Sequence, residues 1–225
     1  MRVLLEAKGL SFAYDGQRQV LKNVNFTVRE GEIVGIMGES GSGKTTLLYC
    51  LSGIIPHVYG GRLEGQVYLA GRDVSKMRLP EIAEDLGMLF QNPDTQLFSG
   101  TVEDDVAFGP ENLLMPWLEI DRSLNRALAV AGMCEKRLAN PKTLSGGEAQ
   151  LAALAATLAL DPAVLLFDEA TSRLDKQGAS ALLAVSANLK KEGKAIVFAC
   201  HDKDHLKIAD RVLLLEDGQL RGETS

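Results

Sequence analysis

Alternating and continuous apolar segments divide the chain into a β-rich beginning, a helical middle, and an end in which strands and helices alternate. Two short alternating segments, 3–7 and 9–14, precede a turn at Asp15-Gly16, and alternation resumes over 20–28, which predicts an antiparallel β layer. Other runs are apolar throughout, as is typical of parallel strands buried on both faces. These runs are 33–37, 86–90, 164–167, 195–199 and 212–215.

Between residues 101 and 160 the spacing of apolar residues becomes helical, with interruptions at Pro110, Pro116 and Pro141. Beyond this stretch, strands and helices alternate again. The order predicts one domain in which a helical part is inserted into an α/β core. Within the single domain of residues 1–225, the predicted boundaries are 1–91 and 161–225 for the core with its β layer, and 92–160 for the helical subdomain.

The stretch from Gly38 to Thr46 lies between a predicted strand and a predicted helix, which is the setting of a phosphate-binding loop. Its glycines let the backbone turn tightly and aim N–H groups at phosphate oxygens, and the helix dipole adds attraction. We expect Lys44 to reach the β- and γ-phosphates and Thr45 to offer its hydroxyl to Mg²⁺. The predicted ATP-binding residues of this loop are Gly38, Glu39, Ser40, Gly41, Ser42, Gly43, Lys44, Thr45 and Thr46.

The loop settles the predicted fold class as α/β. The expected architecture is a P-loop NTPase (RecA-like) core with a mainly parallel sheet, an N-terminal antiparallel β layer and an inserted α-helical subdomain. The apolar run 164–167 ends in Asp168 and Glu169. At the carboxyl end of its strand, Asp168 is placed to hold Mg²⁺ directly or through water. Glu169 beside it is placed to polarise the water that attacks the γ-phosphate.

Another motif, Leu144-Ser145-Gly146-Gly147-Glu148, precedes an alanine-rich helical run. Ser145 and Glu148 fit a capping box, and the run that follows is a strong helix former. The cap alone does not account for Gly146 and Gly147. Their exposed N–H groups beside the Ser145 hydroxyl, at a helix N-terminus, predict a second anion-binding site.

With this motif the chain resembles the ATP-binding-cassette family over nearly its whole length, because that family has a signature loop of the same Leu-Ser-Gly-Gly form. The resemblance implies that two ATPase subunits pack head to tail. Each ATP then lies between the phosphate loop of one subunit and the signature of the other. The signature residues acting on the partner's ATP would be Leu144, Ser145, Gly146, Gly147 and Glu148.

Further positions match the family one by one. Tyr14 resembles the aromatic residue that stacks on adenine, although an edge-strand tyrosine is an alternative. Ser172 and Asp175 resemble the loop that communicates across the dimer, although Asp175 also suits a plain helix N-cap. By this resemblance the catalytic residues are Glu169, His201, Gln91 and Lys44, and the metal ligands are Thr45, Gln91 and Asp168.

One departure from the family lies just after the signature. The family usually has an arginine there, whereas this chain has Gln150-Leu151-Ala152. The missing charge predicts weaker support of the signature helix and a poorer signature donor. A different ATPase subunit is therefore a plausible natural partner, and the choice between homodimer and heterodimer stays open.

The stretch 91–98 followed by 101–112 is similar to the energy-coupling-factor type, whose transporters import vitamins and transition-metal ions such as cobalt or nickel. The stretch Gln91–Phe108 is the predicted docking surface for transmembrane transporter subunits.

ATPase subunits of the energy-coupling-factor type usually continue into a C-terminal segment that holds the dimer, whereas this sequence ends at Ser225 after a polar turn and short strand. We therefore expect dimerisation to depend on ATP or on membrane subunits. Apolar docking or core candidates are Leu97, Phe98, Val102, Val106 and Phe108.

The amino-acid composition and net charge limit the classes of molecule that we expect this chain to bind. Lys and Arg number 24 against 30 Asp and Glu, a net charge of −6, which disfavours nucleic acid as a partner. No apolar stretch has the length of a bilayer span, and no apolar signal segment opens the chain, so we expect a soluble, cytosolic chain. The family resemblance implies that membrane subunits hold it at the cytoplasmic face of the cell membrane as a peripheral protein. The three cysteines, Cys50, Cys134 and Cys200, lack metal-ligand spacing and predict reduced, mostly buried thiols.

The sequence thus predicts the ATPase subunit of an ATP-driven importer. One alternative is a soluble cassette ATPase that acts on nucleic acid or ribosomes, which the acidic charge and the lack of a long coiled coil oppose. Another is a nucleotide-dependent kinase or switch, in which Leu144–Glu148 would have no role. The cargo cannot be read from this chain, because the membrane subunits choose it.

Overall fold

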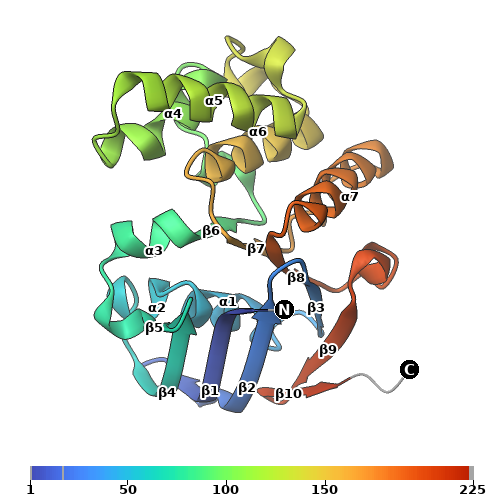
Figure 1. Ribbon diagram of the computed structural model, residues 1–225. Helices are drawn as coiled ribbons and strands as arrows, with labels where there is room; N and C mark the ends of the chain where they lie inside the picture. Colours follow the sequence, from blue (N-terminus) through green and yellow to red (C-terminus); the bar gives the residue numbers. More distant parts are fainter. Residues whose placement is uncertain (1, 17, 223–225) are drawn as a thin grey trace.

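A computed structural model describes residues 2–16 and 18–222, and its helices and strands form layers (Figure 1). The antiparallel sheet lies at one end, a second sheet crosses the middle, and helices α4, α5 and α6 gather at the other end. The strands are β1 Val3–Ala13, β2 Gln19–Arg29, β3 Ile33–Met37, β4 Arg62–Leu69, β5 Arg72–Asp73, β6 Leu86–Leu89, β7 Val164–Asp168, β8 Ala195–Cys200, β9 Arg211–Glu216 and β10 Gln219–Gly222. The α-helices are α1 Lys44–Leu51, α2 Ile54–His57, α3 Leu79–Asp85, α4 Val102–Asn112, α5 Trp117–Ala131, α6 Gly146–Leu158 and α7 Lys176–Lys191.

The N-terminal sheet is antiparallel, as predicted, with the strand order β2-β1-β4-β5. The two alternating segments expected at its start form one strand, β1, and the pairing register with β2 shifts between Ala7 and Leu10. A β-bulge of this kind interrupts the alternation without ending the strand. Because β1 lies between β2 and β4, it is a central strand of this sheet.

The second sheet has the order β10-β9-β3-β8-β7-β6. All its neighbours run parallel except β10, which pairs antiparallel with β9. Along β8, Val197 packs in one apolar core while Ile196 and Phe198 pack in the other. Burial on both faces explains the uninterrupted apolar runs and confirms the predicted, mainly parallel sheet.

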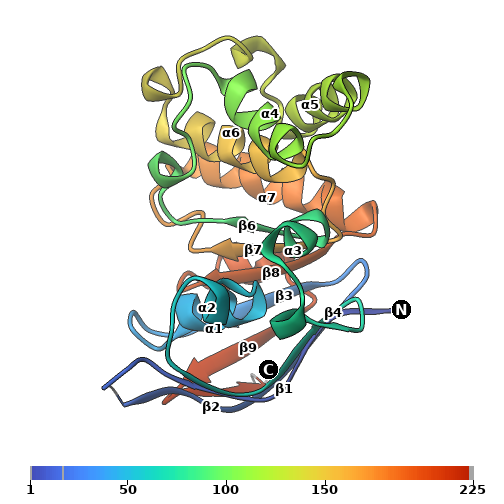
Figure 2. The ribbon, with the colours of Figure 1, turned by 90° about the vertical axis from the view of Figure 1, so that its left-hand side faces the viewer.

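Two apolar cores hold the layers together. One fills the space between the antiparallel sheet, α1 and one face of the parallel sheet, and α1 is seen there in Figure 2. The other joins the opposite face to α4, α5, α6 and α7. The parallel strands are thus fixed from both sides, so the loops at their carboxyl ends rest on a rigid base.

The helical part differs from the prediction at Pro110, which lies inside α4. The helix continues only to Asn112, so this proline affects its last turn alone. Pro116 precedes α5 as its N-cap, and Pro141 begins a short 3₁₀ helix, Pro141–Thr143. The predicted subdomain boundaries at 92 and 160 stay a prediction.

Strand β6 forms one edge of the parallel sheet, and side chains bind its free main-chain groups. The Gln96 side chain accepts a hydrogen bond from the Phe90 N–H at 2.9 Å and donates to the Met88 carbonyl at 3.0 Å. Gln150 donates to the Phe90 carbonyl at 3.0 Å. The Thr157 hydroxyl donates to the Met88 carbonyl at 3.5 Å. Residues beside the strand and on α6 therefore take the place of a further strand.

The end of the chain contains β10, the short polar strand expected there, and residues 223–225 lie outside the described part. Among the described helices, none has the length and apolar character required to cross a membrane.

Two of the three cysteines, Cys50 and Cys200, are buried, and burial raises the pKa of the Cys50 thiol to about 12. Cys134 is exposed, so the three free thiols are mostly buried, as expected.

Candidate functional site

The loop between β3 and α1 borders a hollow of about 370 Å³. Gly38 permits the loop to fold against the sheet, because a Cβ at this position would lie 2.6 Å from the Leu215 carbonyl oxygen. The Ser42 hydroxyl is buried without a hydrogen-bond partner among the described residues. A buried orphan polar group at a phosphate loop fits an absent anionic ligand. The hollow is lined by Tyr14, Val20, Ser40, Gly41, Gly43, Lys44, Thr45, Thr46, Gln91 and Glu169.

Lys44 is almost completely buried, at 4% exposure, and its ammonium group has three partners. It donates to the Gly38 carbonyl at 2.8 Å and the Glu39 carbonyl at 3.0 Å, and lies 3.1 Å from a Glu169 carboxylate oxygen. A buried charge is tolerated only when it is paired in this way. The ammonium is thus held at the hollow, where it can exchange these partners for phosphate oxygens.

Thr45 and Asp168 meet although they are far apart in sequence. The Thr45 hydroxyl donates to an Asp168 carboxylate oxygen at 3.0 Å. Burial raises the pKa of Asp168, and Glu169 raises it further, while the hydrogen bond from Thr45 and the charge of Lys44 lower it. Hydroxyl and carboxylate oxygens are the ligands that Mg²⁺ prefers. The pair fits a magnesium site, and a cation there would favour the ionised carboxylate.

Glu169 follows β7 directly, with a left-handed backbone angle φ of 47°. This conformation is unusual for a residue with a side chain and is typical of strained positions at functional sites. The Glu169 N–H donates to the Ala199 carbonyl at 2.9 Å, and its carbonyl accepts from the Ser172 N–H at 2.9 Å. His201 lies nearby, with Nδ1 3.4 Å from Glu169 Oε2. The backbone of Glu169 is therefore held between β8 and the loop that follows β7.

Gln91 borders the same hollow, and its Nε2 donates to the Ser172 hydroxyl at 3.2 Å. The two residues are 81 positions apart in the sequence, and the structure brings them together. Asp175 caps α7 by accepting from the Gly178 N–H at 2.8 Å, so the plain N-cap interpretation holds for its side chain.

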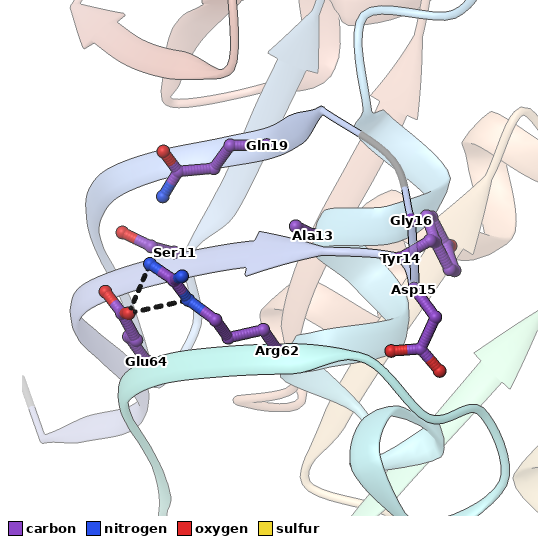
Figure 3. Close-up of a pocket in the computed structure, with 8 residues that line it drawn as sticks. All are labelled: Ser11, Ala13, Tyr14, Asp15, Gly16, Gln19, Arg62 and Glu64. Atoms are coloured by element: carbon purple, nitrogen blue, oxygen red, sulfur yellow. Dashed lines mark hydrogen bonds and ion pairs between the residues drawn. The ribbon is translucent and has the colours of Figure 1, made fainter.

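Tyr14 lies directly after the central strand β1, so the edge-strand alternative is wrong. Its hydroxyl lies 3.2 Å from the Thr46 hydroxyl, and its ring meets Phe12 edge to face at 4.8 Å. Tyr14 also borders a second hollow, of about 290 Å³, on the antiparallel layer. Figure 3 shows Tyr14, Asp15 and Gly16 at one end of it, and the Arg62–Glu64 ion pair among the strands. The sequence did not predict this second hollow, because its lining residues come from separate strands, β1, β2 and β4.

The signature residues begin α6 with a complete capping box. Ser145 Oγ accepts from the Glu148 N–H at 3.3 Å, and Glu148 accepts from the Ser145 N–H at 2.9 Å. This backbone hydrogen bond, with Lys136 at 3.0 Å as a further partner, lowers the pKa of Glu148 to about 2. Packing accounts for Gly147, since a Cβ there would lie 3.0 Å from Gly178 Cα, but it gives Gly146 no such reason.

The signature does not share the hollow of the phosphate loop. Ser145, Gly147 and Glu148 border another hollow, of about 440 Å³, between the first turns of α6 and α7. Leu151 lines its apolar side and partly packs in the core beneath the helices. Among the described residues, the two predicted anion sites of one chain therefore lie in separate hollows.

The predicted docking residues separate into two groups. Leu97, Val102 and Val106 are buried in the helical core, which excludes them from a surface. Phe98 and Phe108 are 64% and 47% exposed, and their rings meet edge to face at 4.8 Å. An exposed aromatic pair is an unusual feature of a free surface.

The comparisons with known proteins agree with this geometry. A family model described as ABC transporter matches residues 21–172. The energy-coupling factor transporter ATP-binding protein EcfA of Methanosarcina acetivorans is 39% identical over 218 residues, covering 96% of this chain and 78% of that protein.

Two solved structures are similar over nearly the whole chain. The structure of cbiO1 from Clostridium perfringens, described as part of the ABC transporter complex cbiONQ, has a TM-score of 0.87 and 30% identity, covering 98% of this chain and 87% of cbiO1. A bacterial ABC transporter cassette, described as dimeric, has a TM-score of 0.82 and 27% identity and covers 98% of both chains. The chain therefore belongs to the ABC transporter family, as an ATPase subunit similar to EcfA and cbiO1.

Proposed function

We propose that this chain binds ATP with Mg²⁺, closes with a second ATPase subunit around the nucleotide, and thereby drives a membrane importer of a vitamin or transition-metal ion. The observation that carries the proposal is the meeting of Lys44, Thr45, Asp168 and Glu169 at one hollow, while the signature borders another. One chain thus supplies two different halves of a site. Two copies, or two related subunits, are needed to complete it.

The residues divide the chemistry as follows. The phosphate loop and Lys44 hold the phosphates. Mg²⁺ is held by Thr45, Asp168 and Gln91. Tyr14 takes the adenine ring on its exposed face. The metal supplies neutralisation of charge on the phosphates. Glu169 accepts a proton from the attacking water, with His201 beside it toward the γ-phosphate.

The signature acts on the partner's ATP. Because Ser145 Oγ already accepts a hydrogen bond from the Glu148 N–H, its own proton is free to be donated to a phosphate oxygen. Gly146 is exposed and leaves the start of α6 open to a close ligand. Leu151 contributes no charge to this helix, so the weaker-donor hypothesis and the preference for a different partner subunit remain predictions.

The first test concerns oligomeric state. Because each nucleotide adds contacts only in the closed state, we expect the isolated chain to be monomeric without nucleotide and dimeric with MgATP when Glu169 is replaced by Gln. Sedimentation velocity at micromolar concentration measures this directly. The matched control is the same variant with Ser145→Ala, which keeps its own phosphate loop but lacks the donated hydroxyl. A stable dimer without nucleotide would contradict the proposed dependence on ATP.

The second test concerns docking to membrane subunits, for which Phe98 and Phe108 are the proposed contacts. Truncating an exposed aromatic contact at an interface costs about 2 kcal/mol, or roughly thirtyfold in affinity. We therefore expect Phe98→Ala to lose copurification with the membrane subunits while the isolated protein keeps its ATPase rate. Leu118→Ala is the control, since Leu118 is also exposed but lies on α5. Equal loss in both variants would exclude a specific role for Phe98.

The proposed location is the cytoplasmic face of the cell membrane, through those subunits. Purifying the complex and identifying the retained small molecule by mass spectrometry tests the cargo class. A vitamin or a transition-metal ion is the expected result, and any other class of cargo would overturn that part of the proposal.

A further inference from the structure

A buried amide links the signature helix to the loop that carries Gln91. Gln150 lies on α6, five residues after Ser145, and is 1% exposed. Its Nε2 donates to the Phe90 carbonyl at 3.0 Å. Its Oε1 is buried and has no hydrogen-bond partner within the described part of the chain. The amide nitrogen of Gln150 is thus hydrogen-bonded, whereas its amide oxygen is not.

The unused half is informative. A buried acceptor without a partner lowers stability, whereas the donor half of the same amide satisfies the Phe90 carbonyl. Strand β6 also does not depend on Gln150 alone, because Gln96 binds the Phe90 N–H and the Met88 carbonyl. The hydrogen bond from Gln150 is thus one of several along this edge, and its place next to Gln91 distinguishes it from the others.

The carbonyl that Gln150 binds lies next to Gln91 in the chain. The Phe90 carbonyl and the Gln91 N–H belong to one planar peptide group, so a donor on this oxygen fixes the direction in which Gln91 leaves the strand. The Gln91 side chain reaches the Ser172 hydroxyl at 3.2 Å, and the Ser172 N–H reaches the Glu169 carbonyl at 2.9 Å. A short series of hydrogen bonds thus runs from α6 to the segment of the proposed catalytic carboxylate.

We propose that Gln150 is a positioning residue that couples the placement of the signature to the placement of Gln91. It acts through the Phe90 carbonyl and does not touch the nucleotide. Because the signature serves the partner's ATP and Gln91 serves the chain's own, Gln150 links the two sites of the dimer. This inference rests on the proposed function.

The first variant is Gln150→Met, which keeps the length of the side chain and removes the donor. We expect kcat for ATP to fall about tenfold or more, because misplacing a group near the reacting atoms affects turnover strongly. Binding of a fluorescent ATP analogue to the monomer and the KM for ATP are expected to stay at wild-type values. Thr157→Val is the matched control: it removes the other α6 donor to the same strand, at Met88, and is expected to keep kcat.

The second variant, Gln150→Glu, tests the donor within one folded protein. A buried carboxyl group has a raised pKa, and only its protonated form can donate to the Phe90 carbonyl. The ratio of its kcat to that of the wild type is therefore expected to rise as the pH falls from 8 to 6, roughly across the titration of a buried carboxyl group. A purely structural role predicts a flat ratio as long as the variant is folded at both pH values, because ionising the buried carboxyl group would then change stability alone.

The outcomes separate this inference from the proposed function. If the wild type neither binds nor hydrolyses ATP, the proposed function fails. If the wild type hydrolyses ATP while Gln150→Met keeps its kcat, or the ratio for Gln150→Glu is flat, the positioning role alone is overturned. Thermal unfolding of Gln150→Glu at both pH values confirms that the ratio compares folded protein, so a loss of stability does not conceal the answer.

Discussion

Lys44→Ala is expected to lose ATP binding almost completely. The ammonium group is the one fixed cation that borders the hollow of the phosphate loop in the described part of the chain, and its bonds to phosphate oxygens are charge-assisted. Losing two such bonds weakens binding by about 3 kcal/mol or more, roughly a hundredfold in Kd. Titration calorimetry with ATP and Mg²⁺ measures the change.

Two controls accompany this result. Lys76→Ala removes an exposed lysine that pairs with Asp73 at 3.4 Å, far from the loop in sequence, and is expected to bind ATP like the wild type. Lys44→Ala also leaves Glu169 without its cation, so thermal unfolding must confirm that the variant is folded. Undiminished affinity in a folded Lys44→Ala protein would remove Lys44 from the site.

Glu169→Gln is expected to keep ATP binding and to lose turnover by a factor of about 100 to 10,000. The amide keeps the shape of the side chain but cannot accept the proton of the attacking water. It also withdraws the negative charge 3.1 Å from Lys44 and thereby frees this cation for phosphate, so binding is expected to be at least as tight. Phosphate release and nucleotide affinity, measured on the same preparation, separate the two effects.

The control for this substitution is Glu84→Gln, on the exposed side of α3. It makes the same chemical change outside the hollow and is expected to hydrolyse ATP at the wild-type rate. If Glu169→Gln also hydrolysed ATP at that rate, another group would have to act as the base.

Local patterns carried much of the prediction. The run 33–37 coincides with β3, and the glycine spacing after it identified the phosphate loop, because both depend on neighbouring residues only. Asp168 and Glu169 were recognisable since the carboxyl ends of parallel strands place acidic residues at one edge of the sheet. The capping box of α6 was likewise a short-range pattern.

Contacts between segments that are distant in the sequence could not be predicted from local patterns. The sequence could not distinguish buried Val102 and Val106 from exposed Phe98 and Phe108, because all are apolar residues and only the packing of α4 on its neighbours separates them. The left-handed backbone of Glu169 likewise has no local signal. It follows from the hydrogen bonds that β8 and the next loop impose on that residue.

The side-chain hydrogen bonds along β6 also affect solubility. An uncovered edge strand is a template on which another chain can add a strand, and proteins avoid aggregation by blocking such edges. Here Gln96, Gln150 and Thr157 bind the main-chain groups that an incoming strand would use. Side chains that come partly from α6 therefore protect the edge of the parallel sheet against strand addition.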